Sequence, residues 1–168
     1  MKVIGALCGA ALLATVGGLA LTAGSGAAAE DGPSSIVEDF THPDAAGILA
    51  RDGLKLFKGD GHIIFDSARD FSQSQCPTGL VQVEKHLDVE PYGKYYCFRT
   101  IGTKGFLTLE VPGTFGVRGG TEDLVVTAKM PDGTTLPPYE VEPNEPVAIE
   151  PGDGTEAPKA ILVEIRMS

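Results

Sequence analysis

Apolar and polar residues alternate in short segments along much of the chain. Leu107, Leu109 and Val111, for example, are separated by single polar residues. Three further segments repeat this period of two: 81–87, 124–130 and 161–167. A period of two with one apolar face is typical of antiparallel strands that bury one side in a core and leave the other side in water. These segments therefore predict strands.

Turn-forming residues lie between the predicted strands. Gly59-Asp60-Gly61 separates 48–57 from 62–65 and predicts a hairpin with a three-residue loop. Pro131-Asp132-Gly133 predicts a second turn, from which 135–141 run back. We thus expect the chain to reverse direction often and over short loops.

Two segments depart from simple alternation. Residues 94–101 contain Tyr95-Tyr96-Cys97-Phe98, which is apolar on both faces, so we predict a central and well-covered strand there. The single place where we expect a helical turn is 67–74, because Asp66 is a suitable capping residue.

The fold class that follows is all-β. We predict an antiparallel β-sandwich of about eight or nine short strands, with a partly closed β-barrel as the alternative. Residues 46–168 form this single β domain, and 30–45 form a flexible lead or an edge strand. We expect a monomer.

The first 29 residues differ from the rest of the chain. Lys2 is followed by an apolar run and then by Ala27-Ala28-Ala29, which is the layout of a secretory signal peptide. We predict a signal peptide at 1–29, cleavage before Glu30, and a secreted, extracellular protein. An uncleaved membrane anchor is the alternative, but the run is rich in glycine and alanine and has no basic residue after it.

The predicted export determines how the cysteines are interpreted. Cys8 belongs to the signal peptide, which leaves Cys76 and Cys97 in the mature chain. An even pair in an oxidising compartment predicts a disulfide bond. Closing a loop of this length contributes about 3 kcal/mol in the chain-entropy treatment. A redox-active or metal-binding thiol pair is the alternative, but the spacing matches no such motif.

Charge and motifs narrow the functional classes. The chain has 13 basic and 23 acidic residues and a net charge of −10. This acidic balance argues against nucleic acid and against anionic membrane surfaces as partners. The sequence contains no nucleophile elbow, zinc-protease, P-loop or dinucleotide-binding motif, so we expect no cofactor and no enzyme activity.

The best candidate for a chemical site is Glu84, His86 and Asp88. These residues are two apart, so in a strand they point from one face and form a candidate metal-binding or acid–base cluster. The alternative, which we favour, is a solvated strand face opposite the apolar Val81 and Val83. We expect no metal there and no pocket above the three side chains.

Two acidic regions are weaker candidates. Asp60-Gly61-His62, with Asp52 and Asp66 nearby, has the composition of a calcium loop but also that of an ordinary turn, which we favour. Residues 140–156 contain six acidic residues and no basic one. This composition indicates a surface for a cationic partner, a weak cation site, or a solvated edge strand protected by charge and proline. We favour the protected edge.

Four segments carry a resemblance to other proteins. They include Arg51-Asp52-Gly53-Leu54 with Lys58-Gly59-Asp60-Gly61-His62, and the segments at 96–99 (YCFR), 105–112 (GFLTLEVP) and 160–166 (AILVEIR). In these segments the chain resembles small secreted actinobacterial proteins of unknown function. The resemblance implies secretion and architecture, and it implies no activity, ligand or functional residue.

We expect a non-catalytic binding or interaction module whose partner is an extracellular protein or a small ligand. The alternative is a secreted enzyme inhibitor or a hydrolase. An inhibitor would need a rigid exposed loop, and the glycine-rich stretch at 112–121 is the candidate for it.

The predicted signal peptide can be tested by mass. When the full-length chain is expressed in a secreting host, the protein in the medium should begin at Glu30, because the small residues before it form the cleavage site. Intact-mass spectrometry measures this directly. Recovery of the full-length chain in the membrane fraction would contradict it.

Overall fold

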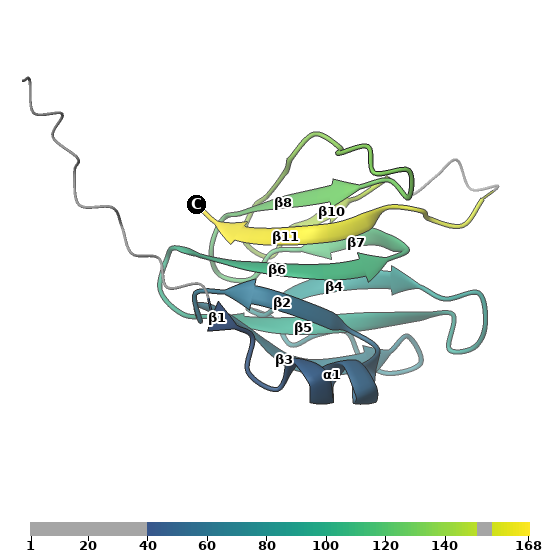
Figure 1. Ribbon diagram of the computed structural model, residues 1–168, viewed down its shortest axis with the longest axis horizontal. Coiled ribbons are helices and arrows are strands. Elements are labelled where there is room, and N and C mark those ends of the chain that lie inside the picture. Colours follow the sequence, from purple (N-terminus) through teal and green to yellow (C-terminus); the bar gives the residue numbers. More distant parts are fainter. Residues whose placement is uncertain (1–39, 151–155) are drawn as a thin grey trace, which may run out of the picture. The chain divides into compact units, whose positions relative to one another are not determined.

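The alternating segments build two antiparallel sheets. The structure is a computed structural model that describes residues 40–150 and 156–168. The predicted signal peptide and the first ten residues of the predicted lead, which together make up residues 1–39, lie outside the described residues. One short helix accompanies the sheets, and Figure 1 shows them lying one behind the other.

Eleven strands make up the two sheets of the described residues. The six-stranded sheet contains, in spatial order, β1 (Phe40–Thr41), β2 (Lys55–Gly59), β6 (Gly105–Pro112), β11 (Ile161–Met167), β8 (Leu124–Lys129) and β9 (Tyr139–Val141). The five-stranded sheet contains β10 (Pro146–Ala148), β7 (Thr114–Arg118), β4 (Val81–His86), β5 (Gly93–Thr100) and β3 (Ile63–Asp70).

The predicted β-sandwich is confirmed, and the two sheets do not close into the alternative barrel. The core lies between the sheets, where Leu107, Leu109 and Val111 of β6 are almost fully buried, as are Val81 and Val83 of β4. Burial of one such side chain contributes about 1.5–3 kcal/mol. The alternation that predicted these strands therefore also identifies the side of each that faces the core.

Three interior strands lie close to where the sequence predicts them. The predicted central strand at 94–101 is β5, which pairs with β3 on one side and β4 on the other. The C-terminal strand β11 lies between β6 and β8. The turn at Pro131-Asp132-Gly133 leads back to β9, which pairs with β8.

The predicted strand at 48–57 is wrong in its first half. Residues Ala45–Asp52 form helix α1, which packs beside β2 at the edge of the sandwich (Figure 1). Gly53 ends the helix with φ 70°, and its N–H bonds to the carbonyl of Leu49. A glycine adopts this left-handed conformation without steric cost, so it separates the helix from the strand that follows.

The helical turn predicted at 67–74 is also wrong, because β3 continues to Asp70. Arg69 pairs with Tyr95 and Asp70 with Lys94, so the strand follows β5 beyond a bulge near Phe65. The first half of the predicted helical turn therefore belongs to an edge strand, and 71–74 belong to the segment between β3 and β4.

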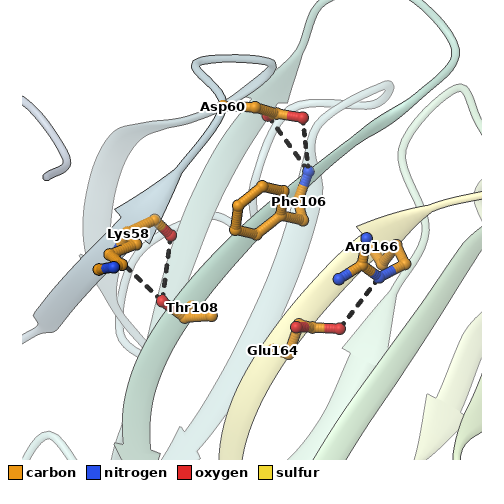
Figure 2. Close-up of polar contacts among 6 residues, drawn as sticks. All are labelled: Lys58, Asp60, Phe106, Thr108, Glu164 and Arg166. Atoms are coloured by element: carbon orange, nitrogen blue, oxygen red, sulfur yellow. Dashed lines mark hydrogen bonds and ion pairs between the residues drawn. The ribbon is translucent and has the colours of Figure 1, made fainter. Parts of the chain in front are cut away.

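The predicted hairpin at Gly59-Asp60-Gly61 is a crossover between the sheets, because β2 and β3 belong to different sheets. The Asp60 carboxylate organises this crossover. It accepts a hydrogen bond from the backbone N–H of His62 at 3.1 Å. It also accepts the backbone N–H of Phe106 at 3.2 Å, as Figure 2 shows. Gly105 lets β6 approach, since a Cβ there would lie 2.5 Å from the Cβ of His62.

The predicted disulfide bond joins Cys76 to Cys97, with 5.6 Å between the Cα atoms. Cys97 lies in β5, and Cys76 lies in the segment between β3 and β4. Within residues 40–150 and 156–168, no helix has both the length and the apolar character needed to cross a membrane.

Asp60 makes the stability of the fold depend on pH. Burial acts to raise the pKa of Asp60, but hydrogen bonds from His62 and Phe106 hold it below its ordinary value of 3.8. The carboxylate therefore stabilises the folded chain above that pH, and this stabilisation is lost as the pH falls through the lower pKa of the folded state.

The variant Asp60→Asn should lower the free energy of unfolding at pH 7 by about 1–3 kcal/mol, because it weakens hydrogen bonds to a charged acceptor. Denaturant unfolding at several pH values measures this loss. The difference in the free energy of unfolding between the variant and the unmodified protein should become smaller below a pH of about 4. The exposed Asp123→Asn serves as the control. A difference that stays constant from pH 7 to pH 3 would contradict this role.

Candidate functional site

The face of β4 that points away from the core is not simply solvated. Gln82 lies on this face and is only 1% exposed, because the segment 71–80 folds back over it. The disulfide bond attaches this segment, which we call the cover, to Cys97 on the same face of β5. The five-stranded sheet therefore buries side chains on both of its faces.

Hydrogen bonds satisfy the buried amide of Gln82. Its Oε1 accepts the backbone N–H of Cys76 at 2.8 Å, and its Nε2 donates to Oε1 of Glu84 at 2.8 Å. Arg118 of β7 donates from Nη2 to the carbonyl oxygen of Cys76 at 2.7 Å. This network joins the cover, β4 and β7, and it holds one oxygen of Glu84 in place.

A groove lies beside this network. It has a volume of about 300 Å³ and runs between Glu84 and β10, with Phe115 and Gly116 of β7 among its walls. Glu84 and Gly116 are register partners on neighbouring strands. A Cβ at position 116 would lie 3.1 Å from Oε2 of Glu84, so the glycine leaves room for the carboxylate.

Aromatic residues lie next to Glu84 on the two neighbouring strands. Tyr95 is its register partner on β5, and the ring of Phe71 from the cover stacks on Tyr95 with 4.5 Å between the ring centroids. Phe71 also contacts Phe115 edge to face, with 6.0 Å between the ring centroids. The Phe71 ring occupies the space above Gly93, where a Cβ would lie 2.4 Å from it.

The structure brings His86 and Asp88 together but does not gather all three predicted site residues into one cluster. Glu84 lines the groove, so the expectation that no pocket lies above this face is wrong for Glu84. His86 lies at the end of β4, with Nε2 3.5 Å from Oδ1 of Asp88, whose side chain is 90% exposed. No cluster of three potential metal ligands occurs in the part of the chain that the structure describes.

The other acidic candidates take part in the structure of the fold. Asp60 is held by backbone N–H groups, with the ring of His62 3.4 Å away. In the acidic stretch at 140–156, the described residues include the edge strands β9 and β10, as the protected-edge interpretation predicts, while 151–155 lie outside the described residues.

The predicted inhibitor loop at 112–121 is wrong, because half of it forms strand β7. A different loop is exposed instead. The turn between β4 and β5 carries Val89 and Tyr92, which are 70% and 60% exposed, and Figure 1 shows this hairpin extending past its neighbours.

One buried tyrosine is not available to a ligand. Tyr96 is 1% exposed, and its hydroxyl donates a hydrogen bond to the carbonyl oxygen of Asp52 at the end of α1. Burial and the nearby Asp52 carboxylate raise the pKa of Tyr96 to about 12. Tyr96 therefore links the helix to β5.

Sequence reasoning missed Gln82, Phe71, Phe115 and Gly116. One signal for Gln82 was present, because the predicted disulfide has to bring the segment around Cys76 onto the outer face of the sheet. The chain matches no protein-family model and no curated protein. The groove is therefore interpreted from its own geometry.

The variant Gln82→Leu should lower the free energy of unfolding by about 1–3 kcal/mol, because it leaves the buried N–H of Cys76 without its acceptor. Denaturant unfolding measures the loss. The control is Gln75→Leu, an exposed position in the cover, which should change stability by less than about 0.5 kcal/mol. Equal effects of the two variants would show that the Gln82 network does not hold the cover.

Proposed function

We propose that this protein is an exported, non-catalytic interaction module that binds an extracellular protein through the groove beside Glu84. The observation that carries the proposal is the groove itself, in which an oriented carboxylate and the aromatic side chain of Phe115 line the same space. Aromatic residues are enriched at binding surfaces because they bury much area with few rotatable bonds.

Two features support export. The layout of residues 1–29 is that of a signal peptide. The Cys76–Cys97 disulfide is the kind of bond that persists outside the reducing cytosol. Together they support an oxidising, extracellular compartment as the place where the groove meets its partner.

A second candidate is enzyme inhibition through the β4–β5 hairpin. Val89 and Tyr92 present apolar surface at its tip, which is the arrangement an inhibitor uses to fill a protease or hydrolase cleft. The hydrolase alternative has no comparable observation in its favour.

Site-specific photo-crosslinking separates the two candidates. A benzophenone side chain is introduced at Ala148 in the groove, at Tyr92 on the hairpin tip, or at Thr103 in the turn at the other end of β5. Each variant is irradiated in culture medium of the source organism, and adducts are identified by mass spectrometry. The proposal predicts one protein adduct from Ala148 and none from Thr103.

Every other pattern of adducts contradicts the proposed interaction through the groove. An adduct from Tyr92 alone would favour the inhibitor and contradict the groove. The same adducts from all three positions would indicate non-specific contact and contradict both. The absence of any adduct in medium where the protein is abundant would also contradict the proposed interaction.

A further inference from the structure

Resting on the proposed function, we infer that the groove receives an organic cation, namely the ammonium group of a lysine or the guanidinium group of an arginine on the partner protein. Glu84 would accept its hydrogen bonds, and the neighbouring aromatic rings and β10 would enclose its aliphatic stem.

The carboxylate of Glu84 is held in place and is available on one side. Oε1 accepts the hydrogen bond from Gln82, which fixes the orientation of the group. Oε2 has no hydrogen-bond or ion-pair partner among the described residues, and it lies over Gly116. A carboxylate with one oxygen anchored and one free binds a cation without the cost of ordering a mobile side chain.

The local charge is not compensated by the groove itself. Among the described residues that line it, Glu84 is the sole charged side chain. Arg118 is the nearest cation along β7, but its Nη2 is directed to Cys76 and Gln82. The chain as a whole carries a charge of −10, which attracts cations to its surface.

The aromatic side chains favour an organic cation over a metal ion or an anion. Phe115 shares the groove with Glu84, and Phe71 and Tyr95 extend the aromatic surface across the face of β5. An ammonium or guanidinium group near a ring face gains cation–π attraction in addition to its hydrogen bond with the carboxylate. A small, hard metal ion would instead need several oxygen ligands.

The remaining walls favour a side chain of a protein over a free small cation. Pro146, Val147 and Ala148 of β10 give the groove an apolar wall, which suits the methylene stem of lysine or arginine. The exposed Val89 and Tyr92 at the tip of the β4–β5 hairpin offer a partner protein further apolar contacts. A small polyamine would leave these contacts unused.

Nuclear magnetic resonance titration of the folded, disulfide-bonded domain tests the inference. The probes are capped lysine (Nα-acetyl-lysine methylamide) and its neutral match, Nα-acetyl-norleucine methylamide. Capped lysine should shift the amide signals of Glu84, Phe115 and Gly116 in a saturable way, and capped norleucine should bind about tenfold more weakly. Equal binding of the two probes would overturn the inference.

Matched variants locate the interaction. Glu84→Gln should weaken binding of capped lysine about tenfold, whereas Asp88→Asn, which removes the same charge from the exposed end of the hairpin, should leave it nearly unchanged. Gly116→Ala should weaken binding as well, because its Cβ displaces the carboxylate. Equal losses in Glu84→Gln and Asp88→Asn would mean that only net charge matters.

Two further results are informative. The first identifies the source of the cation, and the second distinguishes a failure of the cation inference from a failure of the proposed function. A lysine-containing tripeptide flanked by leucines should bind more tightly than spermidine, and tighter binding of spermidine would contradict a protein source. If the photo-crosslinked adduct at Ala148 forms equally well with Glu84→Gln, the interaction module stands and the cation inference fails. If no adduct forms while capped lysine binds, the proposed protein interaction fails.

Discussion

The disulfide bond between Cys76 and Cys97 is the constraint on which the outer face of the five-stranded sheet depends. It ties the cover to the middle of β5, an interior strand, and so places a loop where a β-sandwich ordinarily meets water. Once the cover lies there, the polar side chain of Gln82 is buried and has to be hydrogen-bonded. The bond therefore determines more than the stability of the loop that it closes.

The groove forms at the border of this covered region. One hydrogen bond from Gln82, which is itself bonded to the cover, fixes the orientation of Glu84. Phe71 of the cover places an aromatic ring against Tyr95 and Phe115. Beyond the cover, the edge strand β10 supplies the other wall. An oriented carboxylate thus arises from the same contacts that satisfy buried polar groups, so stability and recognition are coupled at this place.

Much of the fold was predictable because alternation directly reports which side of a strand is buried. Leu107, Leu109 and Val111 show this, and the cysteine pair followed from the predicted compartment. Helix α1 and the crossover at Asp60 were not predictable, because apolar runs and Asp-Gly turns occur in several local structures. The groove was missed for a different reason: alternation shows that Glu84 points away from the core, but distant segments determine what lies around it.

The most direct test of this account is the binding of capped lysine to the Cys76→Ala/Cys97→Ala variant, measured by nuclear magnetic resonance at a temperature where the signals of Val83 and Phe98 show an intact core. If the cover positions Glu84, releasing the cover from β5 should weaken the binding of capped lysine about tenfold, although the sandwich remains folded. Binding as tight as in the disulfide-bonded protein, with the core intact, would show that the groove does not depend on the cover and would contradict the account.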